Sequence, residues 1–133
     1  MGKKQEYKLK NEEYLKELSQ KDGIRTLPHG ILYEVIKEGT GEGKVSARSI
    51  VTCHYRGSLI SGKVFDDSWQ RGIPEAFRVN ELITGFQIAL CAMRKGDHWR
   101  IHIPYQDGYG TKRDGEIPAF STLVFEVELF GIG

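Results

Sequence analysis

Strict alternation of apolar and polar residues in two segments most constrains what this chain can fold into. Both segments lie in its C-terminal part, at His98–Ile103 and Ser121–Phe130. Successive side chains of a strand point to opposite faces, so each segment predicts a strand with one dry face. That face would carry Trp99, Ile101 and Ile103 from the first segment and Leu123, Phe125, Val127 and Leu129 from the second. One-sided alternation is typical of antiparallel sheets, whose apolar face must be covered.

The period changes to that of a helix in residues 84–96. Here Phe86, Ala89, Leu90 and Met93 fall at i, i+3, i+4 and i+7, which places them on one face. Thr84 is the predicted N-cap, Arg94 and Lys95 fit the last turn, and Gly96 fits the exit. This short helix is the expected cover of the sheet.

Four further segments are rich in β-branched and aromatic residues and are bounded by turn signals. They predict strands at residues 31–39, 49–59, 63–68 and 76–79. The expected fold class is α+β: a curved antiparallel β-sheet, or half-barrel, wrapped around one short α-helix, with an additional N-terminal helix.

The first 26 residues differ from the rest because they are rich in Lys and Glu. They predict a helix over residues 5–21 that ends near Gly23, followed by a linker or turn at Thr26–Gly30. The predicted division is a charged helix and linker at 1–26 and a compact domain at 27–133. Tyr7, Tyr14, Leu15 and Leu18 form a narrow stripe on this helix. Either the helix docks by one edge on the domain, or it is the end of a longer partner-binding helix.

Length and charge exclude several classes of protein. A chain of 133 residues suits one domain, and a formal net charge of +1 gives no field that would favour nucleic acid. No apolar run approaches the roughly 18 residues that cross a bilayer. The charged N-terminus is unlike a secretory signal. The sequence leaves the compartment open: the periplasm or cell envelope is expected if a signal has been removed, and the cytoplasm otherwise.

The metal-binding and redox-active residue types are few. Cys53 and Cys91 form no ligand motif, and both are expected to be reduced core thiols, with a disulfide left open. His98 and His102 share one strand face and are expected to be solvated. No third ligand accompanies them, so neither a metal site nor a cofactor is predicted.

Several motifs follow one another in a defined order: HYRG, GKVFDDS, Pro-x-x-Phe, ELITGF, Met-x-x-Gly, IP…YG and IPAFSTLVFEVEL. Together they make residues 27–131 resemble the FK506-binding-protein (FKBP) family of peptidyl-prolyl cis-trans isomerases. The charged helix leading through KDGIRTLPHGILYEVIKEGTG resembles the bacterial subfamily of macrophage-infectivity-potentiator and FkpA-type isomerases. In that subfamily a long N-terminal helical region pairs two subunits.

The resemblance implies an apolar pocket that turns X-Pro bonds, assists protein folding and binds FK506 and rapamycin. It assigns catalytic roles to Tyr55, Phe65, Asp66, Tyr109 and Phe125. It assigns ligand binding to Phe77, Leu82, Ile83, Phe86 and Ile117. The Ile83 N–H and the Tyr109 hydroxyl would donate to substrate carbonyls, and Asp66 would anchor Tyr55. The implied partners are proline-containing polypeptide clients and a second copy of the chain through the N-terminal helix.

The sequence departs from the family at three places, so the resemblance implies the activity more firmly than the substrate preference. Phe86 stands where many relatives carry Trp, Glu75 where some small eukaryotic relatives carry Phe, and the lid Thr111–Gly115 is unusually charged. The departures at Phe86 and in the lid motivate an alternative of another class, a non-catalytic proline-binding or chaperone-type module on the same fold.

The same residues also have simpler interpretations. Taken alone, Phe77, Phe86 and Phe125 would more often pack a core than line a pocket. Asp66 and Asp67 are neighbours in a predicted strand, so they should point to opposite faces rather than form an acid–base pair.

Overall fold

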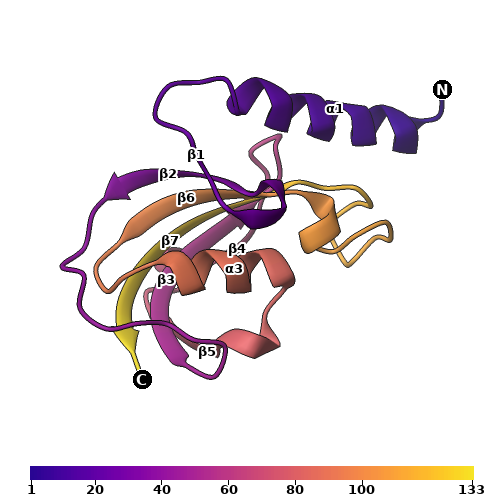
Figure 1. Cartoon of the computed structure of the whole chain (residues 1–133). Coiled ribbons are helices and arrows are strands. Elements are labelled where there is room, and N and C mark those ends of the chain that lie inside the picture. The colour runs from indigo at the N-terminus through magenta and orange to yellow at the C-terminus, as the bar shows by residue number, and fades with distance from the viewer.

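One antiparallel sheet is the central element of the protein, and the computed structural model describes all residues 1–133. The strands run in the order β1-β2-β6-β7-β3-β4, and β5 pairs with β3. Figure 1 shows the sheet curving around helix α3. The strand bounds are β1 Arg25–Thr26, β2 Leu32–Lys37, β3 Ile50–Ser58, β4 Val64–Asp67, β5 Glu75–Arg78, β6 His98–Ile103 and β7 Leu123–Ile132. The expected α+β class is confirmed.

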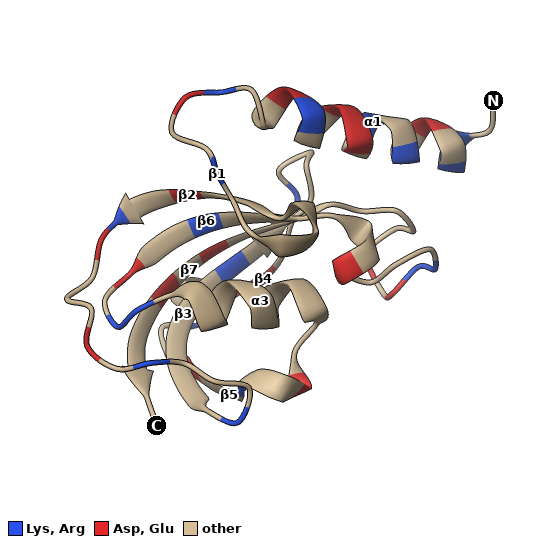
Figure 2. Cartoon of the chain, viewed as in Figure 1, with Lys and Arg blue, Asp and Glu red and all other residues tan.

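Helix α3 (Thr84–Ala92) covers the concave face of the sheet, and its predicted apolar face is buried. Figure 2 shows that it carries no charged residue. Its predicted ends are wrong. Ile83 is the N-cap and Thr84 is already helical, while the extended backbone of Met93 ends the helix before Arg94. The carboxylate of buried Asp97 accepts the Arg94 N–H at 2.7 Å, which stabilises a turn there instead of a longer helix.

The alternation in β6 and β7 orders the core as expected. Every predicted inward residue of these two strands is buried, and the core cluster joins them to the apolar face of α3. Cys53 lies in this core as a free thiol. Cys91 is also free, but it is exposed, so its assignment to the core is wrong. It lies on the side of α3 opposite the buried face.

The polar N-terminal helix α1 spans Lys3–Leu18, so it begins and ends earlier than expected. It lies across one end of the sheet (Figure 1) and carries charges along its length (Figure 2). Gly23, with a positive φ of 83°, belongs to the turn that follows it. The segment Thr26–Gly30 forms the end of β1 and a short 3-10 turn at Pro28–Gly30. No helix of the chain has the length and apolar character needed to cross a membrane.

His102 is only 2 % exposed, so its predicted solvation is wrong. The Tyr14 side chain of α1 covers it, with the hydroxyl 2.8 Å from His102 Nδ1. On the other side of the ring, Nε2 lies 3.3 Å from Glu34 Oε1 on β2. A strand face that looks exposed in the sequence is therefore closed by a distant helix. His98 is half-buried and pairs with Glu126 at 2.9 Å.

We expect the stability of the protein to fall when the solution is acidified. Burial lowers the pKa of His102, although Glu34 opposes this shift. Its ordinary value is about 6.5, so below that pH the unfolded chain binds the proton more readily than the folded chain. The free energy of unfolding should therefore decrease below about pH 6.5, by at most about 1.4 kcal/mol per pH unit.

Urea unfolding at about pH 7.5 and about pH 5 measures this loss. His102→Gln should make it smaller, because the variant has no imidazole to protonate at this buried position. Equal losses in the wild type and His102→Gln would show that other groups cause the dependence. The charged groups near His102 are Glu34 on β2 and Arg100 on β6.

Candidate active site

A hollow of about 320 Å³ lies between α3 and strands β3, β4 and β5. Eight of its ten lining residues are hydrophobic. The lining consists of Tyr55, Phe65, Asp66, Phe77, Glu81, Leu82, Ile83, Phe86, Tyr109 and Phe125. Nine of the ten residues expected from the sequence are therefore brought together. Ile117 is buried in the core and does not line the hollow, whereas the lining residue Glu81 was not predicted.

Five aromatic rings in edge and tilted contacts form the floor and walls. Phe86 and Phe125 are buried, with ring centroids 4.9 Å apart. Phe65 meets Phe125 edge-on at 5.8 Å, and Phe77 meets Tyr55 at 5.4 Å. Rings in such contacts hold one another in place. The core and pocket interpretations of these phenylalanines are thus compatible, because their backs pack the core and their fronts line the hollow.

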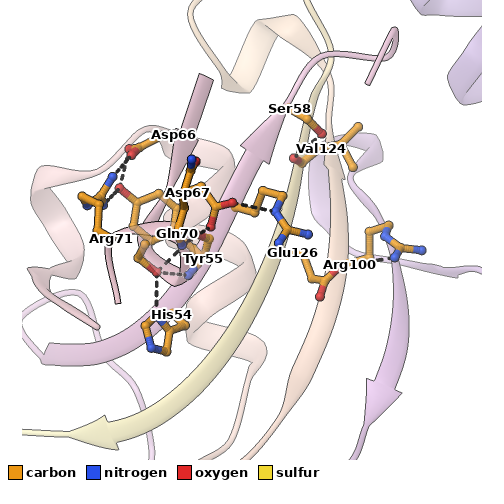
Figure 3. Close-up of polar contacts among 12 residues, drawn as sticks. His54, Tyr55, Ser58, Asp66, Asp67, Gln70, Arg71, Arg100, Val124 and Glu126 are labelled. Carbon is orange, nitrogen blue, oxygen red and sulfur yellow. Dashed lines mark hydrogen bonds and ion pairs between the residues drawn. The ribbon is translucent and has the colours of Figure 1, made fainter. Parts of the chain in front are cut away.

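Tyr55, Asp66 and Arg71 form a hydrogen-bonded cluster at one edge of the hollow, and Figure 3 shows these contacts. The Tyr55 hydroxyl donates to the Asp66 carboxylate, and Arg71 Nη1 donates to Asp66 Oδ1 at 2.6 Å. Arg71 Nη2 also donates to the Tyr55 hydroxyl at 3.3 Å and to Glu75 Oε1 at 3.1 Å. Burial and the bond to Asp66 raise the pKa of Tyr55 to about 12, so it stays protonated at neutral pH.

Sequence reasoning missed Arg71 because it lies on α2 (Ser68–Arg71), a single helical turn that was not predicted. The available signal was Asp67, which caps this turn by accepting the Gln70 N–H at 3.1 Å. Ser68 was missed for the same reason. It is buried, and its hydroxyl accepts the Tyr55 N–H at 2.7 Å, which fixes the backbone of Tyr55.

Asp66 and Asp67 point to different sides of β4, as their adjacency predicts. Asp67 accepts from Arg56 Nε at 3.0 Å, away from the hollow. No paired carboxylates are therefore available for acid–base work. The thiol of Cys53 lies in the core, where burial raises its pKa to about 12 and makes it a poor nucleophile. No cluster of three or more His, Cys, Asp or Glu side chains could hold a metal ion.

Two donors remain at the rim of the hollow. The Ile83 N–H forms no backbone hydrogen bond, although its carbonyl accepts from Phe86 and Gln87. Tyr109 is 39 % exposed. Burial raises its pKa, with a contribution from the carboxylates of Asp114 and Asp66, so its hydroxyl keeps its proton. The hollow thus offers dry aromatic walls and two donors for the carbonyls of a bound peptide.

Comparison with known proteins agrees with this geometry. The sequence model described as "FKBP-type peptidyl-prolyl cis-trans isomerase" matches residues 41–130. The chain is 46% identical over 121 residues to the FKBP-type 22 kDa peptidyl-prolyl cis-trans isomerase of Escherichia coli, covering 90% of this chain and 58% of the relative. It is 44% identical over 115 residues to the macrophage infectivity potentiator of Trypanosoma cruzi, covering 86% and 58%.

Solved structures extend the likeness to the N-terminal helix. A peptidyl-prolyl cis-trans isomerase from Pseudomonas syringae matches with a TM-score of 0.90 at 34% identity, over 100% of this chain and 98% of that one. FkpA from Escherichia coli matches with a TM-score of 0.89 at 35% identity, over 96% of this chain and 59% of that one. The chain spans about half the length of the curated relatives that it matches. This protein therefore belongs to the FKBP-type peptidyl-prolyl cis-trans isomerase family.

Proposed function

We propose that this chain catalyses the cis–trans rotation of X-Pro peptide bonds in proline-containing polypeptides. The observation that carries the proposal is the hollow itself. It is aromatic on its floor and walls, has two donors at its rim and contains no nucleophile–base pair. FK506 and rapamycin, which the family binds, would occupy the same hollow.

The reaction needs no bond to be broken. Amide resonance imposes a rotation barrier of about 18–20 kcal/mol, and unaided X-Pro isomerisation takes tens to hundreds of seconds. The planar amide is more dipolar than the twisted one, so water stabilises the planar form more strongly. An apolar hollow removes part of that preference and holds the prolyl ring while the bond turns. A barrier reduction of roughly 5–8 kcal/mol would accelerate the rotation by about four to six decades.

Each part of the site has a role in this scheme. Phe86 and Phe125 would support the prolyl ring from below, and Phe65 and Phe77 would flank it. The Ile83 N–H and the Tyr109 hydroxyl would donate to the carbonyls on either side of the turning bond. Tyr55, Asp66 and Arg71 would hold the polar edge in one geometry.

A progress curve of cis-to-trans isomerisation in a short X-Pro peptide tests the proposal. Catalytic amounts of the protein should shorten the half-time, and FK506 should restore the uncatalysed rate. Asp66→Val should lower the rate less than loss of a wall ring does. An unchanged half-time at micromolar protein would contradict the proposal.

The charged lid and Phe86 in place of Trp favour a second function, a chaperone-type module that holds unfolded clients. The hollow would then bind exposed proline and aromatic segments with little turnover. Suppression of aggregation of a client without a slow proline step, by a variant with no isomerase activity, would support it.

We also propose that the chain divides into an N-terminal helix and linker at 1–26 and an isomerase domain at 27–133. The helix would pair two copies of the chain. Leu9 is 41 % exposed on α1, on a helix that already uses Tyr7 and Tyr14 to dock on its own domain. A second copy would cover the outer side of this helix. Sedimentation of the wild type and Leu9→Glu tests it, since the variant should be monomeric if the wild type is a dimer.

A further inference from the structure

Three side-chain hydrogen bonds join helix α1 to the domain. Asn11, at 1 % exposed, is the one buried residue of α1. The hydrogen bonds come from three side chains of one helix face, Tyr7, Asn11 and Tyr14, at i, i+4 and i+7. Tyr14 contacts His102 on β6, one turn along the helix from Asn11. A buried amide on an otherwise polar helix indicates a specific bond rather than general apolar packing.

The bond of Asn11 is made to the chain that leads into β7. Its Oδ1 accepts the Thr122 N–H at 2.7 Å, and its Nδ2 donates to the Tyr7 carbonyl at 2.8 Å. The Tyr7 hydroxyl lies 2.9 Å from Ser121 Oγ. In Figure 1, α1 lies above the loops that lead into β7. Two neighbouring residues of one loop are thus held by two side chains of the helix.

The loop held in this way has a conformation that needs support. Phe120 has a φ of +67°, which non-glycine residues seldom adopt. Its ring packs edge-on against Tyr105 at 5.0 Å and lies 5.7 Å from Lys8 Nζ of α1. Residues in such conformations persist only when their surroundings fix them, and here α1 supplies part of those surroundings.

The same loop contacts the rim of the hollow. The Phe120 N–H donates to the Gly110 carbonyl at 3.0 Å, and Gly110 follows Tyr109, the rim donor. Asn11 is therefore connected to Tyr109 through Thr122, Phe120 and Gly110. None of these contacts is made by the aromatic floor, which belongs to β7 and α3.

We propose that Asn11 is a positioning residue of the isomerase, and that α1 holds the loop 118–122 so that Tyr109 stands at the rim of the hollow. This inference rests on the proposed function. Without the Asn11 bond, the loop samples other positions, and only a fraction of the molecules presents Tyr109 correctly. The apparent affinity for a ligand falls in proportion to that fraction, while the rate of the bound complex is retained.

Steady-state kinetics on an X-Pro peptide tests it with two variants of the same helix. Asn11→Ala should raise KM about fivefold and leave kcat within about twofold. Tyr14→Phe is the matched control, because it loosens α1 at His102 and leaves the loop contacts intact. It should leave KM unchanged. An equal rise of KM in both variants would show that general docking of α1 matters rather than the Asn11 bond to the loop. An unchanged KM in Asn11→Ala would also overturn the inference.

Two further measurements keep the test decisive. If Asn11→Ala does not fold, Tyr7→Phe removes only the bond to Ser121 and should raise KM in the same direction; an unchanged KM overturns the inference. If the wild type does not catalyse rotation, the proposed function fails. Hydrogen exchange of the Phe120 amide then tests separately whether Asn11 holds the loop 118–122. Exchange that is no faster in Asn11→Ala than in Tyr14→Phe would overturn it.

Discussion

Phe65→Ala is expected to lower kcat/KM for an X-Pro peptide about 30-fold, because the substrate loses apolar contact of about 2 kcal/mol. Phe65 is a half-buried wall of the hollow whose ring meets Phe125 edge-on. Its removal should cost less than about 2 kcal/mol of stability, below the usual loss for a fully buried phenylalanine. Activity and urea unfolding of the same preparation measure the two effects.

Phe130→Ala is the matched control for this change. Phe130 is 42 % exposed near the end of β7, where it contacts the His54 ring at 5.6 Å and no part of the hollow. It should leave kcat/KM unchanged. Equal activity losses in the two variants, or a Phe65→Ala protein with wild-type kcat/KM, would show that the aromatic walls are not the site of reaction.

Gly57→Ala is expected to disturb the hollow from behind. A Cβ on Gly57 would lie 2.7 Å from two ring atoms of Phe65 and 2.8 Å from Cε1 of Phe125. Both rings line the hollow, and both would have to shift. We expect a loss of stability of about 1–3 kcal/mol, typical of overpacking, and at least about a tenfold loss in kcat/KM.

Gly131→Ala makes the same change in a strand without the crowding. Its Cβ would meet the Cβ of Thr52 at 3.6 Å, an ordinary contact. Stability should therefore stay within about 0.5 kcal/mol of the wild type, and activity should not change. Similar effects at Gly57 and Gly131 would mean that the glycine requirement is a property of the strands and not of the aromatic floor.

Local periodicity was enough to predict β6, β7, the cover helix and their inward residues, and composition with turn signals predicted β2 to β5. In β7 and α3 the apolar period fixes which side chains meet, because a slip of one residue in β7 would expose its buried face. The residues of the hollow could be predicted only from the ordered motifs that resemble the FKBP family. No period brings Tyr55, Phe77 and Tyr109 together from three distant parts of the chain.

The missed features depend on contacts between remote segments or on an element too short to show a period. His102 alternates as an outward residue, and only the docking of Tyr14 buries it. Asn11 looks like any polar residue of a charged helix until Thr122 is placed beside it. Arg71 lies on one helical turn, which is too short to give a period. Such polar, single-residue contacts leave little pattern in the sequence.

A pH–rate profile tests most directly whether the hollow turns the peptide bond by its apolar surroundings and fixed donors, without proton transfer. The pKa of Tyr55 is raised to about 12 and that of Tyr109 is raised too, so both hydroxyls stay protonated near neutrality. From about pH 6.5 to about pH 9, kcat/KM on an X-Pro peptide should be flat. A bell-shaped profile, or a tenfold change per pH unit within that range, would contradict it and indicate an acid or base at the reacting bond.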